Sequence, residues 1–316
     1  MLAPQGLEYI VGVLGTIAAG FIAVPLPVPL SGRNDERVSA ALNDCSPAAV
    51  LTTSAVVSAV DSCVHALPGP RPTMIEIDAL DLYTAPARQS TGTSPITKAA
   101  LLQYTSGSTR VPAGVLVTHR NIIVNIKELL ADYFADNGGV PPAGLTGVSW
   151  LPLYHDMGLQ TEIFSPLLGG YPQVLTSPVA FLQKPARWLQ MLAGNRSFSA
   201  APNFAFDLAV RRTSDDDMAG LDLGDVHTVL SGSERVHAAT LRRFTERFSR
   251  FNFPDTALKP SYGLAEATVY VVSSNPGRPP TTARFDYEKL SAGHATRCSG
   301  DVGSELVGHG TPRACT

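Results

Sequence analysis

Cysteine is scarce and scattered in this sequence, which has four cysteines among its 316 residues. They form no Cys-x-x-Cys pair and show no spacing typical of metal ligands. The pattern argues against a disulfide-rich scaffold and against a zinc site. It favours unpaired thiols in a reducing cytoplasm, where we therefore expect the protein to act.

Clusters of basic residues are missing as well, and the formal net charge is -3. Arg211-Arg212, for example, is followed at once by Asp215-Asp216-Asp217, which is typical of a solvated face. The sequence therefore gives no electrostatic case for a nucleic-acid partner or for an anionic membrane surface.

A membrane-spanning run is not predicted either. Residues Tyr9–Val24 are largely apolar, but the first basic residue is Arg33, so no positively charged segment precedes them as in a secretory signal. The run is short for a bilayer, and prolines follow it. We expect a buried helix over Leu7–Ala19, a short strand over Phe21–Pro25, and no transmembrane segment.

The composition, 44% hydrophobic and 16% charged, is that of a globular protein. Strand-like apolar runs alternate with segments of helical spacing, which predicts an α/β fold with mostly parallel sheets flanked by helices. The predicted helices after the first cover Asp35–Asn43, Asn121–Phe134, Pro185–Ala193 and Thr240–Phe248. The predicted strands cover Ala48–Thr53, Thr73–Ile77, Gly114–Thr118, Val148–Leu151, Gln173–Leu175, Phe198–Ala201, Thr228–Leu230 and Leu258–Ser261.

A hydroxyl-rich loop follows an apolar run, and it consists of Thr105, Ser106, Gly107, Ser108 and Thr109. Its glycine lets the backbone approach a phosphate closely, while its N–H and hydroxyl groups offer donors to negative charge. No Gly-Lys-Ser/Thr follows at the required spacing, so this is not the loop of P-loop NTPases. An ordinary Ser/Thr/Gly turn is the alternative interpretation.

Three further polar tracts lie directly after strand-like runs, namely Trp150–Gly158, Ser231–Glu234 and Ser261–Thr268. Ligands of parallel sheets bind beyond the carboxyl ends of the strands. The shared placement of these tracts and the hydroxyl-rich loop therefore predicts one composite site. No Gly-x-Ser-x-Gly elbow is present, so no serine hydrolase of the α/β type is indicated.

In their order along the chain and in their residues, these four tracts resemble the core motifs of adenylate-forming enzymes. These enzymes include acyl-CoA synthetases, fatty acyl-AMP ligases and adenylation domains. The chain is most similar to the actinobacterial fatty acyl-AMP ligases within that superfamily. Arg110 and Ala113 stand where CoA ligases commonly have glycine and lysine, and Ser231–Arg235 matches the ligase version of the adenine loop. Asn275–Cys298 looks like the insertion that discourages the use of CoA.

The resemblance implies the fold of the large N-terminal domain of these enzymes, without their small C-terminal domain. We expect a partial core over residues 1–274, then the insertion and the start of the following subdomain over residues 275–316. The implied activity joins a long-chain fatty acid to ATP, which gives an acyl-adenylate and pyrophosphate with Mg²⁺ as cofactor. The implied acceptor of the acyl group is an acyl carrier domain of a polyketide synthase.

The resemblance also implies a role for each motif residue. Glu266 would bind magnesium, and the alternative is an acidic residue that favours the first turn of a helix. His155 would lie near the acyl carboxylate or close the pocket, and the alternative is a structural histidine. The residues that would bind the nucleotide are Thr105, Ser106, Gly107, Ser108 and Thr109 at the phosphates, Tyr262 stacked on adenine, Gly232, Ser233 and Glu234 at the rim of the base site, and Ser261, Gly263 and Ala265 by close backbone approach.

The chain departs from the family pattern at both ends. Complete members begin before Met1 and end after Thr316, and they carry a Thr-Gly-Asp tract, a hinge arginine and a C-terminal lysine domain that are not found here. We expect a chain truncated at both ends and impaired in adenylation. Two interpretations stay open: a fatty acyl-AMP ligase without its C-terminal domain, and a non-catalytic remnant or nucleotide- or acyl-binding module that keeps the fold.

Overall fold

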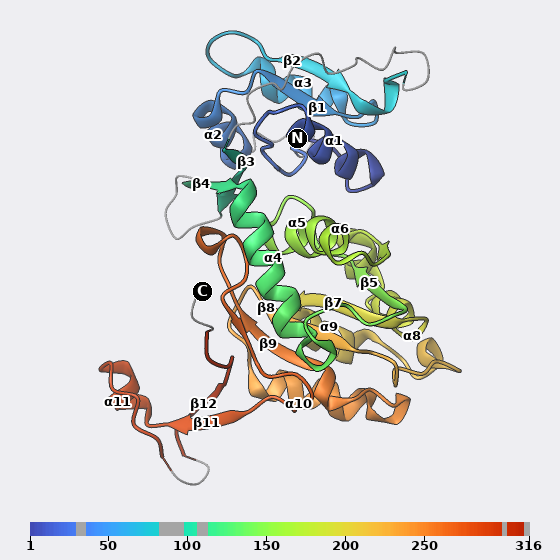
Figure 1. The fold of residues 1–316 in the computed structure, drawn as a ribbon, viewed down its shortest axis with the longest axis vertical. Coiled ribbons are helices and arrows are strands. Elements are labelled where there is room, and N and C mark those ends of the chain that lie inside the picture. Colours follow the sequence, from blue (N-terminus) through green and yellow to red (C-terminus); the bar gives the residue numbers. More distant parts are fainter. Residues whose placement is uncertain (30–35, 82–97, 106–112, 299–301, 313–316) are drawn as a thin grey trace. The chain divides into compact units, whose positions relative to one another are not determined.

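A computed structural model describes residues 1–29, 36–81, 98–105, 113–298 and 302–312 (Figure 1). The chain divides into two compact units, which are described separately. The first unit comprises Met1–Ile122 and Pro152–Leu159, and the second comprises Ile123–Leu151 and Gln160–Thr316. The division expected at residue 274 stays a prediction.

The first unit begins with helices around a short parallel sheet. Helix α1 (Leu7–Ala18) and helix α2 (Glu36–Cys45) precede strand β1 (Ala49–Thr52), and helix α3 (Val57–His65) leads to strand β2 (Thr73–Glu76), which pairs with β1 in parallel. The helices predicted over Leu7–Ala19 and Asp35–Asn43 and the strands predicted over Ala48–Thr53 and Thr73–Ile77 are confirmed, and α3 was not predicted. Apolar side chains at helical spacing in α2 and α3 join β1 in one core, whose members include Val38, Leu42, Val50, Val60 and Val64.

The strand predicted over Phe21–Pro25 is wrong in this form. Only Ala23 pairs, in an isolated bridge to Leu101, where the Ala23 N–H donates to the Ala100 carbonyl at 2.9 Å. The prolines that follow have no N–H group, so they cannot extend a ladder of hydrogen bonds.

A pair of antiparallel strands in the first unit precedes helix α4, most of which belongs to the second unit. Strands β3 (Ala99–Thr105) and β4 (Ala113–Thr118) are antiparallel, and helix α4 (His119–Tyr133) follows directly. Thr118 and Asn121 cap this helix reciprocally, since the Asn121 N–H donates to Thr118 Oγ1 and the Thr118 N–H donates to Asn121 Oδ1, both at 3.0 Å. The strand and the helix predicted here are confirmed.

The second unit is built on a six-stranded sheet in the order β10-β9-β8-β7-β5-β6, in which only β10 is antiparallel to its neighbour. The mostly parallel sheet predicted from the sequence is therefore confirmed. Its strands are β5 (Leu145–Ser149), β6 (Gln173–Leu175), β7 (Arg196–Pro202), β8 (Thr228–Gly232), β9 (Leu258–Tyr262) and β10 (Val272–Ser273). Strand β5 ends two residues earlier than predicted.

Helices flank both faces of this sheet (Figure 1). On one face Trp188 of α8 (Ala186–Ala193) donates its indole N–H to Ser199 of β7 at 2.9 Å. On the other face the rings of Tyr133, the last residue of α4, and of Phe134, which follows it, pack against Phe198. Tryptophan and phenylalanine rings join α8, α9 and α10 in a buried aromatic cluster. The remaining helices are α5 (Asp156–Leu159), α6 (Ser165–Gly169), α7 (Pro178–Gln183), α8 (Ala186–Ala193), α9 (Asn203–Arg212) and α10 (Ala238–Phe248), and a π-helical turn (Gln160–Phe164) joins α5 to α6.

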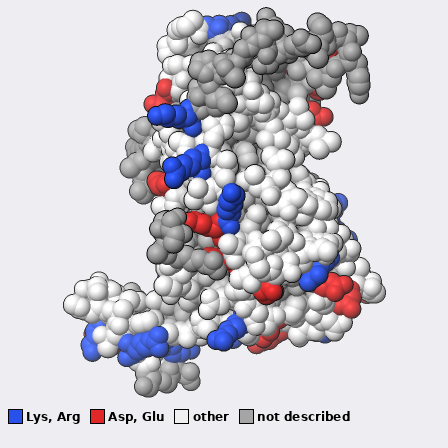
Figure 2. Space-filling model, in the orientation of Figure 1, with Lys and Arg blue, Asp and Glu red and all other residues white. Residues whose placement is uncertain are grey.

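A small hairpin follows the sheet. Strands β11 (Thr282–Phe285) and β12 (Ser304–Val307) are antiparallel, and helix α11 (Tyr287–Ser291) begins after Asp286, whose carboxylate accepts from the Lys289 N–H at 3.0 Å. Arg242 of α10 makes an ion pair with Glu305 of β12 at 2.9 Å, which ties the hairpin to the helix. Basic side chains gather over this hairpin on the face shown in Figure 2.

No helix in the described ranges has both the length and the apolar character that spanning a bilayer requires. Helix α1 ends at Ala18, well short of the apolar run that continues to Val24.

Candidate functional site

Two of the predicted motifs meet at the carboxyl edge of the large sheet. Strands β8 and β9 are parallel neighbours, with Ser231 opposite Pro260, so the residues that follow each strand emerge side by side. The two backbones approach closely, because a Cβ atom on Gly232 would lie 3.1 Å from the Ser261 carbonyl oxygen. The structure therefore brings the motif Ser231–Glu234 and the motif Ser261–Thr268 together.

Two residues at this edge have conformations suited to a ligand. Ser233 has a φ of 62°, in the left-handed region that serine adopts only at a cost of about 1–3 kcal/mol. Such strain is common at binding sites, where a backbone group must be aimed. Tyr262 ends β9 with 54% of its surface exposed, which leaves a ring face open to a planar base.

The turn after β9 is held rigidly from two sides. Gly263 lies against the backbone of Val269, and a Cβ atom at that position would be 1.6 Å from the Val269 carbonyl oxygen. Asn125 of α4 donates to the Tyr270 carbonyl at 2.7 Å and accepts from the Tyr270 N–H at 2.9 Å. Ser261 accepts from the Tyr133 hydroxyl of the same helix at 3.2 Å. Helix α4 therefore fixes the turn that carries Glu266.

Glu266 lies in a 3-10 turn (Ala265–Ala267) and is exposed. Its carboxylate has no hydrogen bond or ion pair with the residues that the structure describes, so it is open to a cation. Ala265, its neighbour, is buried. Across the described ranges no three His, Cys, Asp or Glu side chains gather as they would in a protein-only metal site. An exposed carboxylate supplies the hard oxygen donor that Mg²⁺ prefers.

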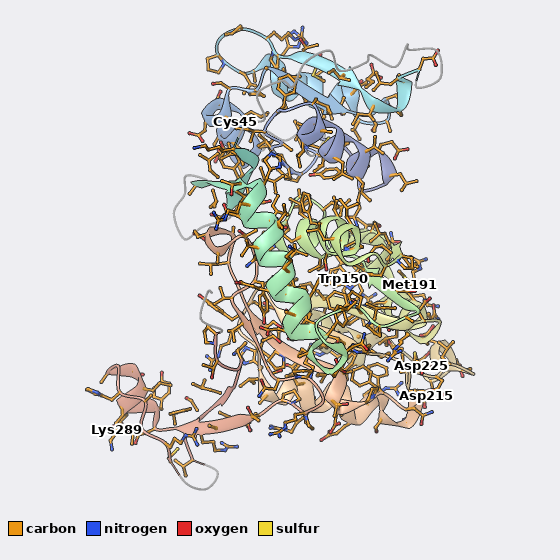
Figure 3. The ribbon with its side chains drawn as sticks, in the orientation of Figure 1. Cys45, Trp150, Met191, Asp215, Asp225 and Lys289 are labelled. Carbon is orange, nitrogen blue, oxygen red and sulfur yellow. The ribbon has the colours of Figure 1, made fainter. Side chains whose placement is uncertain are left out.

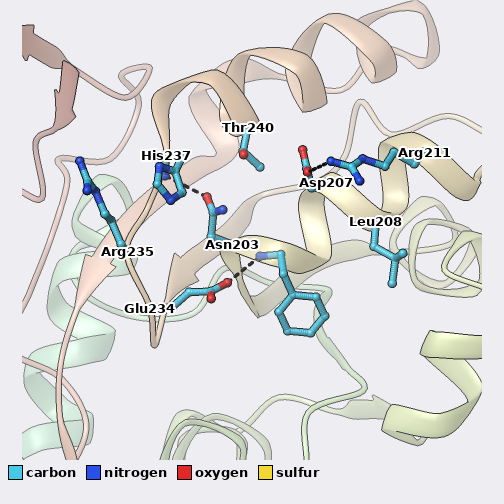
Figure 4. Close-up of a pocket in the computed structure, with 9 residues that line it drawn as sticks. Asn203, Asp207, Leu208, Arg211, Glu234, Arg235, His237 and Thr240 are labelled. Carbon is cyan, nitrogen blue, oxygen red and sulfur yellow. Dashed lines mark hydrogen bonds and ion pairs between the residues drawn. The ribbon is translucent and has the colours of Figure 1, made fainter. Parts of the chain in front are cut away.

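Glu234, which is predicted to lie at the rim of the base site, also makes a hydrogen bond within the protein. Its Oε1 accepts from the Phe204 N–H at 2.6 Å, at the start of α9, and Asn203 accepts from the His237 N–H at 3.0 Å, at the start of α10 (Figure 4). These bonds tie the loops after β7 and β8 together. A cavity of about 420 Å³ lies beside them, lined by Asn203, Phe204, Asp207, Leu208, Arg211, Glu234, Arg235, His237 and Thr240.

Asn203 is a residue of this edge that the sequence analysis missed. It is buried and follows β7 directly, the same placement that marked the other motifs. The signal was present in Pro202-Asn203, because a polar residue there follows a predicted strand.

In the first unit, Thr105 is the last residue of β3 and pairs with Ala113 of β4. The other predicted phosphate-binding residues, Ser106, Gly107, Ser108 and Thr109, lie outside the described residues, as does Arg110. Strand β4 separates the loop from α4, so the predicted anion site depends on the loop's own N–H and hydroxyl groups.

His155 lies in a turn that the same hairpin supports. The Gln103 side chain of β3 donates to the Tyr154 carbonyl at 2.9 Å, so the turn lies against the strand that ends at Thr105. His155 Nδ1 pairs with Asp156 at 2.6 Å, and 48% of the His155 side chain is exposed. Burial lowers the pKa of His155, but the hydrogen bond and the charge of Asp156 outweigh it, so the net pKa is raised. That these two residues serve the same nucleotide as Tyr262 and Glu266 stays a prediction.

Trp150 lies inside the second unit (Figure 3). Its ring stacks on Phe181 at 3.8 Å between centroids, and edge contacts join it to Trp188 and Phe204. The start of the motif Trp150–Gly158 is therefore anchored in an aromatic core next to the loop after β7.

A family model described as AMP-binding enzyme matches residues 1–299. The chain belongs to this family.

Curated relatives match the chain over nearly its whole length. It is 56% identical over 314 residues to the long-chain-fatty-acid–AMP ligase FadD28 of Mycobacterium tuberculosis, which covers 99% of this chain and 54% of that protein. It is 57% identical over 318 residues to FadD26 of Mycobacterium marinum, with the same coverage. It is 55% identical over 323 residues to a 4-hydroxyphenylalkanoate adenylyltransferase of Mycobacterium tuberculosis, which covers 100% of this chain and 51% of that protein.

Solved structures agree with the family assignment. A fatty acyl-adenylate ligase from Legionella pneumophila, in complex with acyl adenylate and pyrophosphate, superposes with a TM-score of 0.87 at 31% identity. That match covers 98% of this chain and 54% of the other. An adenylation domain of a keto acid-selecting module, at 18% identity and a TM-score of 0.82, shares the fold. The chain spans about half the length of the curated relatives it matches.

Proposed function

We propose that this chain supplies the nucleotide- and acyl-binding core of a fatty acyl-AMP ligase, which joins a long-chain fatty acid to ATP and forms acyl-adenylate and pyrophosphate. One observation carries the proposal: Gly232, Ser233, Tyr262 and Glu266 stand at one edge of a parallel sheet, with the tyrosine ring and the carboxylate both exposed. Two of the relatives, which are about 56% identical, are named long-chain-fatty-acid–AMP ligases.

In the proposed reaction a fatty carboxylate oxygen attacks the α-phosphorus of ATP, and the bond to pyrophosphate breaks. Two anions must meet, so the site must reduce their repulsion and align them. Tyr262 stacks on adenine, and the backbone around Gly232 and Ser233 borders the base. The Thr105–Thr109 loop donates to the β- and γ-phosphates.

Magnesium, when bound, neutralises the phosphate charge, and Glu266 is the residue we propose as its protein ligand. His155 has its Nδ1 atom paired with Asp156, which orients the ring and favours the protonated form. A protonated imidazole is a suitable partner for the incoming carboxylate, so His155 would position the acid for attack.

The same proposal extends to the setting of the reaction. We propose a reducing cytoplasm, since Cys45, Cys63 and Cys298 are free thiols. The acyl-adenylate is an activated mixed anhydride that needs an acceptor, and we propose an acyl carrier domain of a polyketide synthase for that role.

Exchange of radioactive pyrophosphate into ATP, driven by a long-chain fatty acid, tests the proposed function. We expect exchange by the chain to exceed that of Glu266→Ala, and we expect the exposed α10 variant Glu246→Ala to match the unaltered chain. Exchange no faster than the Glu266→Ala background would overturn the ligase proposal. If an acyl-adenylate analogue still bound in that case, the chain would be a nucleotide- and acyl-binding module.

A further inference from the structure

A cavity of about 570 Å³ lies in the first unit, and none of its lining residues is among those proposed above to bind the nucleotide. Helix α1 and its C-cap residue border the cavity from Val11 to Ala19, and strand β1 with the residues before it borders the cavity from Cys45 to Leu51. The volume falls within the range of roughly 300–1,000 Å³ that is typical of small-molecule sites. The first unit therefore has room for a ligand of its own.

Small side chains on one face of α1 leave this room. Gly12, Gly15, Thr16 and Ala19 line the cavity and recur at helical spacing. A Cβ atom on Gly12 would lie 2.7 Å from Ile77 Cδ1, in the turn after β2, whereas a Cβ atom on Gly15 would meet nothing within 4 Å. The helix therefore packs closely at Gly12, and open space begins at Gly15.

The sheet of β1 and β2 presents a partly covered apolar face to the cavity. Val50 and Met74 are paired, and both pack in the core with α2 and α3. Leu51 and Ile75 are paired one residue further along, so their side chains face the opposite side of the sheet. Both line the cavity and are only half-buried. The described part of the chain thus leaves apolar sheet surface open to a ligand.

The cavity is deep at one end and open at the other. Leu2, Ala23 and Val50 line it and are at most 2% exposed, whereas Phe21 and Leu80 line it and are exposed. A molecule can enter from solvent and be enclosed at the far end. This depth favours a small molecule over a protein partner, because protein interfaces are broad surfaces of about 800 Å² on each partner.

The wall of the cavity is apolar and uncharged. Among the described residues that line it, no side chain is charged, and the polar side chains are Thr16, Cys45 and Ser46. Thr16 donates to the Gly12 carbonyl at 2.6 Å, Ser46 donates to the Asn43 carbonyl at 3.3 Å, and burial raises the pKa of the Cys45 thiol. A cavity holds water only where several polar groups await partners, and an apolar cavity binds apolar molecules instead. The wall therefore suits an uncharged apolar ligand.

The cavity is elongated along α1. From Val11 to Ala19 the helix rises about 12 Å, at about 1.5 Å per residue. From Ala48 to Leu51 the facing strand segment extends about 10 Å. These two borders favour a flexible chain that can follow them over a compact ring.

We propose that this cavity binds the alkyl chain of an uncharged lipid, a long-chain alcohol, whose hydroxyl group stays at the opening beside Ser46. Ser46 lines the cavity and is exposed, and its oxygen can accept a hydrogen bond from the alcohol while its own O–H donates to Asn43. The site is separate from the proposed adenylation reaction and does not depend on it.

Calorimetric titration of the whole chain with 1-hexanol, 1-octanol and 1-decanol tests the proposal. We expect one alcohol molecule per chain and an affinity that rises about fourfold with each added CH₂ group, the factor that about 0.8 kcal/mol per buried CH₂ gives. The polar analogue 1,10-decanediol should bind about tenfold more weakly than 1-decanol, because its second hydroxyl group would be buried without a partner.

Two variants locate the binding site. Gly15→Leu and Ala19→Leu enlarge side chains that line the cavity, so each should weaken binding of 1-decanol by about tenfold or more. Ala18→Leu is the matched control, since Ala18 is the exposed neighbour on the same helix and does not line the cavity; it should bind like the unaltered chain. Bound 1-decanol should also slow alkylation of Cys45, followed by peptide mass spectrometry, and leave Cys298 of the second unit unaffected.

The proposal is overturned if no alcohol binds, if affinity does not change with chain length, or if the diol binds as tightly as 1-decanol. Binding that is unchanged in both cavity variants, or equal slowing of both cysteines, would place the alcohol elsewhere and also overturn it. Should Gly15→Leu fail to fold, Ala19→Leu decides the question. If sedimentation shows a dimer that Ala19→Leu dissociates and 1-decanol does not, a second copy of the chain occupies the cavity and the proposal is wrong.

Discussion

Gly263 shows how a single position constrains the turn that carries Glu266. A Cβ atom there would overlap the Val269 carbonyl oxygen, and that oxygen belongs to backbone, which cannot swing away as a side chain can. The glycine is therefore required by contact rather than by flexibility. The sequence motif placed a glycine at this point, but only the structure gives the reason.

We expect Gly263→Ala to lower the free energy of unfolding by roughly 2–4 kcal/mol, because the turn must move to admit the methyl group. Urea denaturation measures the change. Gly194→Ala is the matched control, since a Cβ atom there would meet nothing closer than 3.9 Å, and it should stay within about 0.5 kcal/mol of the unaltered chain. Equal stability of the two variants would contradict the close packing of Gly263.

Glu162 gives the protein a pH dependence of known sign. Burial raises its pKa from 4.5 to about 8, so the folded protein keeps a proton that the unfolded chain releases between these values. The stability that the neutral carboxyl group permits is fully present below about pH 4.5 and is lost as the pH rises through about 8.

Glu162→Gln should remove this part of the pH dependence, because the amide does not ionise. Above pH 8 the variant should be more stable than the unaltered chain by on the order of 2–4 kcal/mol, and the difference should shrink toward pH 5. Denaturation curves collected at several pH values measure it. A difference that does not vary with pH would show that Glu162 is ionised in the folded protein.

At the scale of elements, helix α4 holds the turn after β9 within the second unit. Thr118 and Asn121 fix where the helix begins, and Asn125 binds both backbone groups of Tyr270. The Tyr270 hydroxyl also donates to Asp132 of the same helix. The position of the Glu266 turn therefore depends on a helix far away in the sequence.

Asn125→Ala should destabilise the protein by roughly 2–4 kcal/mol, because it leaves two backbone groups of Tyr270 without their partner in a buried place. It should also weaken binding of ATP, as the turn with Tyr262 and Glu266 loosens. Thermal denaturation and nucleotide titration measure the two effects. Asn137→Ala is the control, because the Asn137 side chain is exposed and donates to the Val140 carbonyl. An equally small effect of both variants would show that the two hydrogen bonds of Asn125 do not hold the turn after β9.

The elements also show where sequence reasoning succeeds and where it stops. Helices with strong apolar spacing, such as α2 and α10, and the short apolar strands of the large sheet were predicted, because local pattern decides them. The strand predicted at Phe21–Pro25 is wrong, since Pro25 at its end and Pro27 beyond it have no N–H group to continue a ladder of hydrogen bonds. Strand β5 was placed too late because Trp150 and Leu151 are apolar for a different reason: they are buried in the core beyond the strand's end.

Some features of the large sheet could be predicted from the sequence and others could not. The motifs at the ends of β8 and β9 could be found from their residues and from the strands that precede them. The pairing of Glu162 with Ser149 and the place of Gln173 over Gly147 could not, because they depend on the register between β5 and β6. Sequence periodicity shows that a strand exists, and it does not give the residue opposite each position.

At the scale of the whole molecule, the chain has two compact units, each with a core of its own. The first holds the strand that ends at Thr105 and the turn of His155, and the second holds the sheet edge with Tyr262 and Glu266. The AMP-binding family assignment covers both units, as the match extends over residues 1–299. The central proposal for the molecule is therefore that a nucleotide binds at the edge of the large sheet.

Calorimetric titration with a non-hydrolysable acyl-adenylate analogue tests that claim most directly, with the unaltered chain and Tyr262→Ala compared side by side. We predict that the analogue binds to one site on the unaltered chain and that Tyr262→Ala weakens binding about tenfold to a hundredfold, as expected for the loss of one stacked aromatic ring. Equal affinity of the two proteins, or no binding to the unaltered chain, would contradict the account.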